Sequence, residues 1–149
     1  MKIPILGNIY KAIYISRFAE SFGTLLHGGI PVVQALEVSG SATGNFVFDQ
    51  IGKEVAEGVR RGEPISKLLQ NYPEYFPPLV SQMVYVGENT GRLDALLKRI
   101  SVYYFNEVDN GFKVLLEMIQ PVLIVVIAVF VGILIAGVLL PIYQLAQVV

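Results

Sequence analysis

The sequence predicts an all-α protein, a cytoplasmic antiparallel bundle of six helices whose long last helix continues into a transmembrane helix. Apolar residues recur at helical spacing, and glycine and proline separate the helical stretches. No stretch has the period-two alternation and hairpin turns of β-strands. Hydrophobic residues make up 54% of the 149 residues, and the mean hydropathy is +0.59. This apolar share exceeds that of a typical soluble domain, so we expect part of the chain to lie in lipid.

The first 15 residues are predicted to form a lead-in segment. Their apolar run is superficially like a signal peptide, but Pro4, Gly7 and Asn8 interrupt it and no small-residue cleavage site is evident. We therefore reject a signal peptide. The first amphipathic helix is expected to begin near Ile13.

Turn residues separate the first three predicted helices. Gly28 and Gly29 suit the C-cap of the first helix, and Pro31 suits the first turn of the second. Asn45 can cap the third helix, in which apolar residues recur every four positions and charged residues occupy the other face. Gly62 is expected to stop this third helix.

Three more helices are predicted after that point. Pro64 opens a short fourth helix, and an aromatic connector leads to a fifth helix over about 79–86. The sixth helix follows the GENTG motif, and its apolar periodicity continues past Leu115. Pro121 lies where this helix would enter lipid, and we expect it to kink the helix there. Short connections favour antiparallel neighbours in such a bundle.

The end of the chain has the composition of a membrane span. The last 32 residues carry no charge, and the twenty residues from Pro121 to Leu140 include no strongly polar side chain. Twenty helical residues span about 30 Å, the thickness of a bilayer's hydrocarbon core. We therefore predict a transmembrane helix over residues 118–141. Residues 1–117 then form the domain and residues 142–149 a short tail on the far side of the membrane.

Two further features of this region bear on topology and assembly. Basic residues precede the span and none follows it, so the positive-inside rule places residues 1–117 in the cytoplasm and the tail in the periplasm. Within the span, Ala128, Gly132 and Ala136 recur every four residues. Such a ridge of small residues predicts close helix–helix contact in the bilayer.

Composition excludes several kinds of site. The chain has no cysteine, and His27 is its only histidine. Disulfides, cysteine nucleophiles and thiolate metal sites are therefore absent, and little remains for a histidine metal site or a Ser/His/Asp triad. We expect His27 to interact with the carbonyls at a helix end. A formal net charge of −1 gives no reason to expect nucleic acid as a partner. We predict no catalytic residue, cofactor or metal.

The stretch VGENTGRLDALL, residues 86–97, is the main candidate site. It lacks the lysine and the preceding strand of a phosphate-binding loop. Glu88 and Asp94 are its nearest carboxylate pair. We expect Glu88 to pair with Arg92 across a turn, and Asp94 to favour the positive end of the sixth helix. Asn89 or Thr90 is expected to cap that helix.

The two glycines of this stretch have a mechanical interpretation. Either Gly87 or Gly91 can end the fifth helix while the other frees the backbone for a reversal. The sequence therefore predicts an architectural corner that includes Glu88, Arg92 and Leu93, with its polar residues exposed as a docking surface.

Four segments together resemble the type II secretion system F domain family. They are RFAESFGTLLHGGIPVVQALEVS, GEPISKLL, FPPLVSQMVYVGENTGRLDALLKRISVYYFNEVD and LLEMIQPVLIVVIAVFVGILIAGVLLPIYQL. The resemblance extends from about Arg17 to Leu145. Its most specific element is the VGE-x-x-G-x-L signature, followed by a long helix and a span ending in LPI.

The resemblance implies a non-enzymatic platform protein of the bacterial inner membrane. Such proteins serve type IV pilus, type II secretion and competence machines. They are thought to bind a cytoplasmic assembly ATPase and to pass pilin or pseudopilin subunits into a filament. Other inner-membrane assembly proteins, membrane lipid and further copies of the chain, with a dimer as one form, are the remaining partners implied.

The chain departs from the family pattern in two respects. Family members usually carry two copies of the domain and about three spans, whereas this chain resembles the second copy and the last span. We therefore expect it to be a piece of a longer protein, with a naturally short form as the alternative. The family also often has Glu-Pro where the last span begins, and here the pair is Gln120 and Pro121.

Other functions remain as alternatives. The machine could be the competence pseudopilus, used in DNA uptake. A different class is a membrane-anchored hydrolase that uses Glu88 and Asp94. A third is a single-span receptor or adaptor whose bundle binds a soluble ligand.

Overall fold

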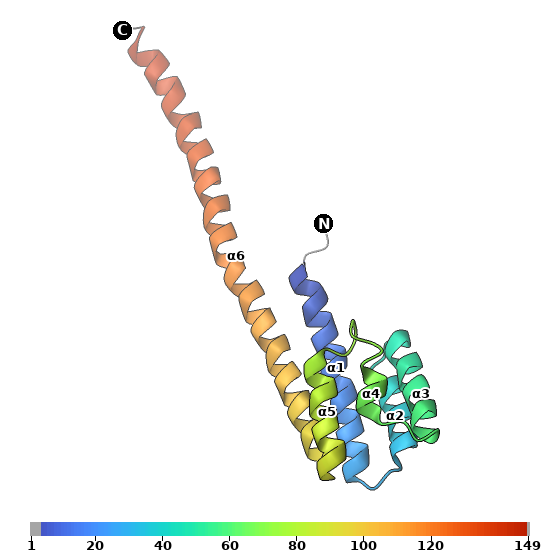
Figure 1. The fold of residues 1–149 in the computed structure, drawn as a ribbon. Coiled ribbons are helices and arrows are strands. Elements are labelled where there is room, and N and C mark those ends of the chain that lie inside the picture. The colour runs from blue at the N-terminus through green and yellow to red at the C-terminus, as the bar shows by residue number, and fades with distance from the viewer. Residues whose placement is uncertain (1–3, 149) are drawn as a thin grey trace. The chain divides into compact units, whose positions relative to one another are not determined.

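The computed structural model describes residues 4–148, and within them it has six α-helices and no strand. The predicted all-α fold with a long last helix is therefore confirmed. The helices are α1 (Pro4–His27), α2 (Val32–Ala42), α3 (Phe46–Arg60), α4 (Ile65–Leu69), α5 (Pro78–Thr90) and α6 (Leu93–Ala146) (Figure 1). The chain divides into two compact units, Met1–Asn110 and Gly111–Val149, called unit 1 and unit 2 below.

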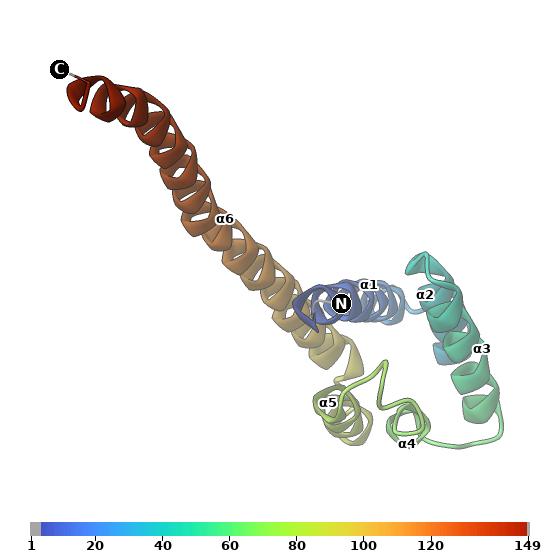
Figure 2. The same ribbon diagram turned by 90° about the horizontal axis from the view of Figure 1, so that it is seen from above.

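Unit 1 has one continuous apolar core. Seen along the bundle, α2 and α3 form one pair of helices and α4 and α5 another, with α1 next to both pairs (Figure 2). The connector before α5 contributes Phe76, whose ring lies 5.2 Å from that of Phe18 and 5.3 Å from that of Phe48. The aromatic connector is thus part of the core. The largest fully buried apolar side chains are Phe22, Phe48, Phe76, Ile15, Leu36, Leu69, Leu97, Ile100, Val55 and Val84.

Helices α2 and α3 are in direct backbone contact. A Cβ atom added to Gly52 would lie 3.0 Å from the Cα of Gly40 and 2.9 Å from the carbonyl oxygen of Leu36. Contacts this short leave no room for any side chain at the crossing. The two glycines therefore set how closely this helix pair packs.

Helix α1 starts earlier than predicted. It begins at Pro4 instead of near Ile13. Proline is tolerated in the first turn of a helix, and one helical glycine costs only about 1 kcal/mol. Burial of Ile9, Ala12 and Ile15 on one face outweighs that cost. Tertiary packing thus overrides the helix breakers in this stretch.

The first part of α6 runs antiparallel to α1. The Ser16 hydroxyl donates a hydrogen bond to the Ser101 carbonyl oxygen at 3.0 Å. Seven residues further along α1, a Cβ atom on Gly23 would lie 3.2 Å from that of Leu97. Nearly two turns of α1 therefore pack tightly against α6 within unit 1.

The predicted turn residues lie near helix ends. Asn45 caps α3, because its side chain accepts hydrogen bonds from the amides of Val47 and Phe48. Gly62, with φ of +89°, follows the last turn of α3, and Gly29, with φ of +81°, follows α1. The Gly28 amide donates to the Thr24 carbonyl, and Pro31 is the N-cap residue of α2, just before its first turn.

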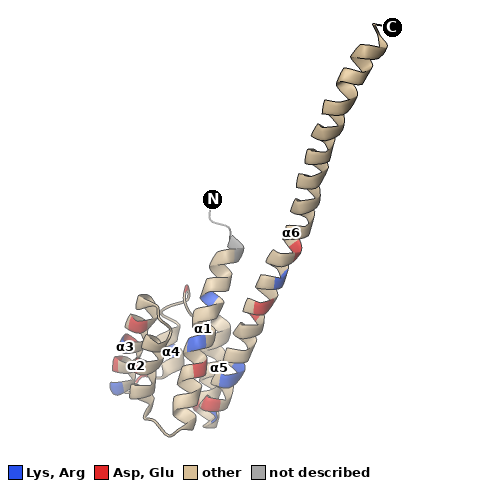
Figure 3. Ribbon diagram, turned by 180° about the vertical axis from the view of Figure 1, so that it is seen from behind, with Lys and Arg blue, Asp and Glu red and all other residues tan. Residues whose placement is uncertain are grey.

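Among the described residues, α6 is the one helix long and apolar enough to cross a membrane. Charged residues occur only in its first part and are absent beyond Glu117 (Figure 3). Pro121 and Pro141 both lie inside the helix. The kink at Pro121 and the small-residue contacts of Ala128, Gly132 and Ala136 stay predictions.

Candidate docking site at the α5–α6 corner

The turn between α5 and α6 is made by Gly91. Its φ of +66° is left-handed, and its amide donates to the carbonyl of Gly87. The amide of Arg92 donates to the same carbonyl at 3.1 Å. Because Gly91, and not Gly87, adopts the left-handed conformation that ends the helix, α5 continues through Thr90. The helix therefore ends four residues later than predicted, and most of the GENTG motif is helical.

Gly87 has a different role from Gly91. It is buried within α5, and a Cβ atom added to it would lie 2.9 Å from the Cα of Leu93, the first residue of α6. The missing side chain lets α6 start directly against α5. The corner thus needs one glycine for backbone conformation and another for close approach.

Asn89 and Thr90 do not cap α6, contrary to expectation. The Asn89 side-chain amide donates to the carbonyl of Tyr85, and the Thr90 hydroxyl donates to that of Val86, both at 2.7 Å. Since both residues belong to the last turn of α5, their side chains bond to carbonyls of their own helix.

Glu88 has a partner that the sequence did not suggest. Its carboxylate accepts hydrogen bonds from the backbone amides of Ile65, at 2.6 Å, and Ser66, at 3.2 Å. These amides open α4, where the N-cap residue Pro64 makes no side-chain capping bond. The expected pairing with Arg92 is wrong within the described residues, because Glu88 instead caps a neighbouring helix.

Asp94 lies in the first turn of α6, as expected, and joins it to α1. Its carboxylate lies 3.1 Å from Nδ1 of His27 in the last turn of α1. The His27 side chain is 84% exposed, so this pair contributes little to stability by itself. Sequence reasoning missed the pair because the residues are 67 positions apart.

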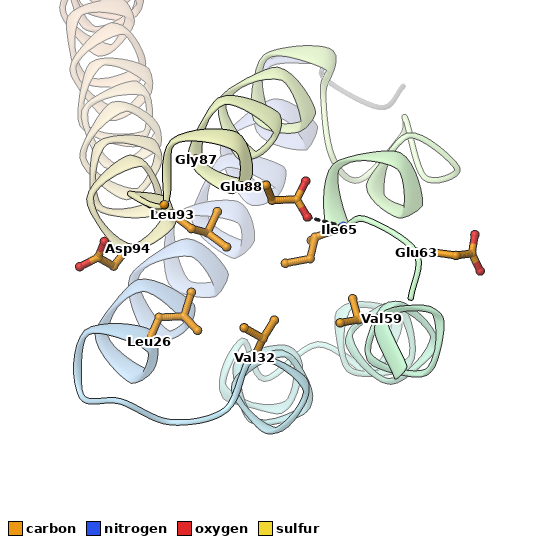
Figure 4. A pocket seen from close by; sticks show the side chains of 10 residues that line it. Leu26, Val32, Val59, Glu63, Ile65, Gly87, Glu88, Leu93 and Asp94 are labelled. Carbon is orange, nitrogen blue, oxygen red and sulfur yellow. Dashed lines mark hydrogen bonds between the residues drawn. The ribbon is translucent and has the colours of Figure 1, made fainter. Parts of the chain in front are cut away.

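A hollow of about 470 Å³ lies beside the corner (Figure 4). All six helices contribute to its wall, and the side chains of Leu26, Val32, Ile65 and Leu93 point into it. The carboxylates of Glu63 and Asp94 point away from it. The hollow therefore presents a largely apolar interior, with the Glu88 carboxylate at its wall and the carboxylates of Glu63 and Asp94 outside. Its lining residues are Leu26, Val32, Val59, Glu63, Ile65, Gly87, Glu88, Gly91, Leu93 and Asp94.

This arrangement suits binding better than catalysis. The Glu88 carboxylate is held by two backbone amides, and the Asp94 carboxylate is turned outward toward His27. Neither carboxylate faces the other across a space for substrate. Within residues 4–148, no three His, Cys, Asp or Glu side chains gather as metal ligands.

Comparison with known proteins identifies the family. Residues 18–141 match the family described as type II secretion system (T2SS), protein F. The chain belongs to this family. Its resemblance to F-domain proteins is thereby confirmed over most of its length.

Relatives of the T2SS protein F family come from both pilus and secretion systems. The chain is 35% identical over 149 residues to the type IV pilus assembly protein PilC of Pseudomonas aeruginosa, covering 100% of this chain and 40% of that protein. The chain is 33% identical over 145 residues to PilC of Thermus thermophilus, and the match covers 97% of this chain and 36% of that protein. The chain is 26% identical over 149 residues to the type II secretion system protein F of P. aeruginosa, and the match covers 100% of this chain and 36% of that protein.

The chain thus spans between 36% and 40% of the length of these T2SS protein F relatives. Membership of the family and the apolar α6 together indicate association with a membrane. The relatives' names describe assembly and secretion, and none of these names is that of an enzyme.

Proposed function

We propose that the chain is part of a non-enzymatic inner-membrane platform protein of a type IV pilus or type II secretion machine. It couples a cytoplasmic assembly ATPase to the insertion of pilin or pseudopilin subunits. The observation that carries this proposal is the family match over residues 18–141, together with relatives named for pilus assembly and secretion.

In this proposal, the α5–α6 corner is the docking site for the ATPase. Asn89, Thr90 and Arg92 are exposed there, and the apolar hollow lies beside them. An apolar anchor residue entering a pocket, surrounded by polar contacts, is the usual pattern of a protein–protein contact. The rigid turn at Gly91 and the packing of Leu93 on Gly87 keep this surface in one shape.

The membrane topology belongs to the same proposal. Residues 1–117 lie in the cytoplasm, residues 118–141 cross the inner membrane and residues 142–149 reach the periplasm. The distribution of charge supports this orientation, because basic residues precede the span and none follows it. The ridge of Ala128, Gly132 and Ala136 is the proposed contact between copies.

A hydrolase that uses Glu88 and Asp94 is disfavoured by the hydrogen bonds of both carboxylates. Purified wild-type protein and Glu88→Gln can be compared for nucleotide and ester turnover. We expect no turnover by either protein. Wild-type activity that disappears in Glu88→Gln would contradict the platform function.

The direct test uses the full-length protein in its native membrane. Gly91→Val places a β-branched residue at φ of +66° in the corner, whereas Gly44→Val places one at φ of +73° in the α2–α3 turn. Neither site has another atom within 4 Å of the added Cβ, so the backbone strain is matched. The assembly ATPase and pilin that co-purify are then quantified, along with assembled filaments.

We expect Gly91→Val to lose the ATPase and the filaments, while Gly44→Val at equal membrane abundance retains both. Equal retention by the two variants would show that the corner does not dock the ATPase. Absence of ATPase and pilin from wild-type preparations would refute the platform function itself.

A further inference from the structure

Unit 1 has an end from which α6 continues toward the apolar segment, called the exit end here. Since α1 is antiparallel to α6, the start of α1 lies at this end. Tyr10 is six residues nearer that start than Ser16, which bonds to Ser101. Six helical residues cover about 9 Å, so Tyr10 is level with the last part of α6 in unit 1.

Two other helices begin at the exit end. The ring of Phe48, in the first turn of α3, lies 5.5 Å from that of Tyr14 on α1, so Phe46 at the start of α3 belongs to this end. Helix α5 reverses into α6 at Gly91, which places its second residue, Leu79, at the exit end as well.

Large apolar side chains are exposed on four helices at this end. Phe46 is 76% exposed, Phe105 65%, Tyr10 59% and Leu79 40%. Phe46 is the most exposed large apolar side chain of the described part of unit 1. The opposite end carries the charged or ionisable side chains of His27, Arg60, Arg61, Glu63, Arg92 and Asp94.

The chain itself limits how far the exit end can be from lipid. Pro121 follows Asn110, the last residue of unit 1, by 11 positions within the single helix α6. Eleven helical residues are about 16 Å long, comparable to the headgroup layer plus one side chain. Aromatic rings with one apolar and one polar edge are typical of that layer.

We propose that the exit end of unit 1 rests on the membrane interface, with Tyr10, Phe46, Leu79 and Phe105 in contact with lipid. Apolar contact drives this association. Lys11 lies beside Tyr10 at the exit end, but the acidic residues Asp49, Glu74 and Glu107 outnumber it there, so attraction to anionic headgroups is not its source. The proposal rests on the membrane span and is independent of which machine the protein serves.

The chain contains no tryptophan, so a single introduced one reports on one site. Tyr10→Trp and Phe46→Trp probe the exit end. Tyr85→Trp on α5 is the matched control, because Tyr85 is 60% exposed and Tyr10 is 59% exposed. Each whole-chain variant is reconstituted, one copy per disc, into phosphatidylcholine nanodiscs with or without lipid that carries a nitroxide just below the headgroup. Helix content is verified by circular dichroism.

We expect the nitroxide lipid to lower the emission of Tyr10→Trp and Phe46→Trp about twofold relative to Tyr85→Trp. Acrylamide, which stays in the water, should quench the emission of Tyr85→Trp more than that of Tyr10→Trp and Phe46→Trp. Replacing part of the phosphatidylcholine by the anionic lipid phosphatidylglycerol should leave the difference in nitroxide quenching between these variants unchanged. Equal nitroxide quenching of all three variants would overturn the proposal. The proposal would also be overturned if Tyr10→Trp and Phe46→Trp were quenched only in discs that hold two copies, because a second copy would then cover this surface.

Discussion

The carboxylate of Glu88 lies 2.6 Å from the backbone nitrogen of Ile65, so a side chain near the end of α5 caps the start of α4. The preceding residue, Pro64, has no side-chain group that could do this. Helix α4 has only five residues, and such a short helix depends on partners outside itself. The α5–α6 corner and α4 are therefore coupled through one carboxylate.

Removal of this carboxylate should weaken α4. We expect Glu88→Ala to lower the free energy of unfolding by about 1–2 kcal/mol, the usual cost of losing a helix cap. Amide hydrogen exchange at Ile65 and Ser66 should accelerate together. Urea unfolding of the detergent-solubilised chain and exchange mass spectrometry measure the two effects. Glu57→Ala is the control, since Glu57 bonds to the exposed Arg60, and it should leave exchange in α4 unchanged.

The α2–α3 crossing should tolerate no added methyl group. In Gly52→Ala the new Cβ would lie 2.9 Å from a carbonyl oxygen of α2, so we expect a loss of about 1–3 kcal/mol in unfolding free energy. Gly7→Ala is a matched change in α1, where nothing lies within 4 Å of the added atom. It should stabilise the helix by up to about 1 kcal/mol. Similar urea midpoints for the two variants would contradict the crossing geometry.

Titration of Tyr72 should be displaced to high pH. Its hydroxyl donates a hydrogen bond to the Glu54 carboxylate, and this bond, with partial burial, raises the pKa of Tyr72 to about 12. The neutral phenol is thus favoured by folding. Its contribution to stability is complete below the unfolded pKa of about 10 and is lost as pH rises through about 12.

The Tyr72 titration can be isolated by subtracting the phenolate absorbance of Tyr72→Phe from that of the wild type. Glu54→Gln should bring the pKa of Tyr72 down toward 10, because the hydrogen-bonded carboxylate is its largest cause. Glu57→Gln should leave the titration curve unaltered. A wild-type midpoint at 10 would show that the hydroxyl and Glu54 do not interact.

The ridge of small residues in α6 predicts association between copies in the bilayer. Gly132→Leu would separate two helices that meet along Ala128, Gly132 and Ala136, so energy transfer between labelled copies in vesicles should fall several-fold. Val129→Leu adds bulk one position after Ala128, on another face, and should leave transfer unchanged. Equal transfer in both variants would exclude this ridge as the contact.

Local signals predicted much of the fold. Asn45 was recognisable as a cap because its partners, the amides of Val47 and Phe48, are two and three residues away. Gly91 was recognisable as one of two turn candidates for the same reason. The number and order of the helices followed from such signals and from apolar spacing.

Interactions between distant residues were not predictable in this way. Glu88 and Ile65 are 23 positions apart, and nothing near either residue indicates the other. The role of Gly87 depends on the position of Leu93 after the chain has reversed. The start of α1 was misjudged because the burial of Ile9 and Ala12, which outweighs the helix breakers, arises only in the folded bundle.

The contact between Gly40 and Gly52 also has a mechanical consequence. With backbone against backbone, and no flexible side chains between them, α2 and α3 cannot slide past each other without losing the whole contact. Under load this hairpin should move as one stiff piece. Elastic deformation would then concentrate in the joints around it, such as the link from Gly28 to Pro31, where an added Cβ at Gly29 meets nothing within 4 Å.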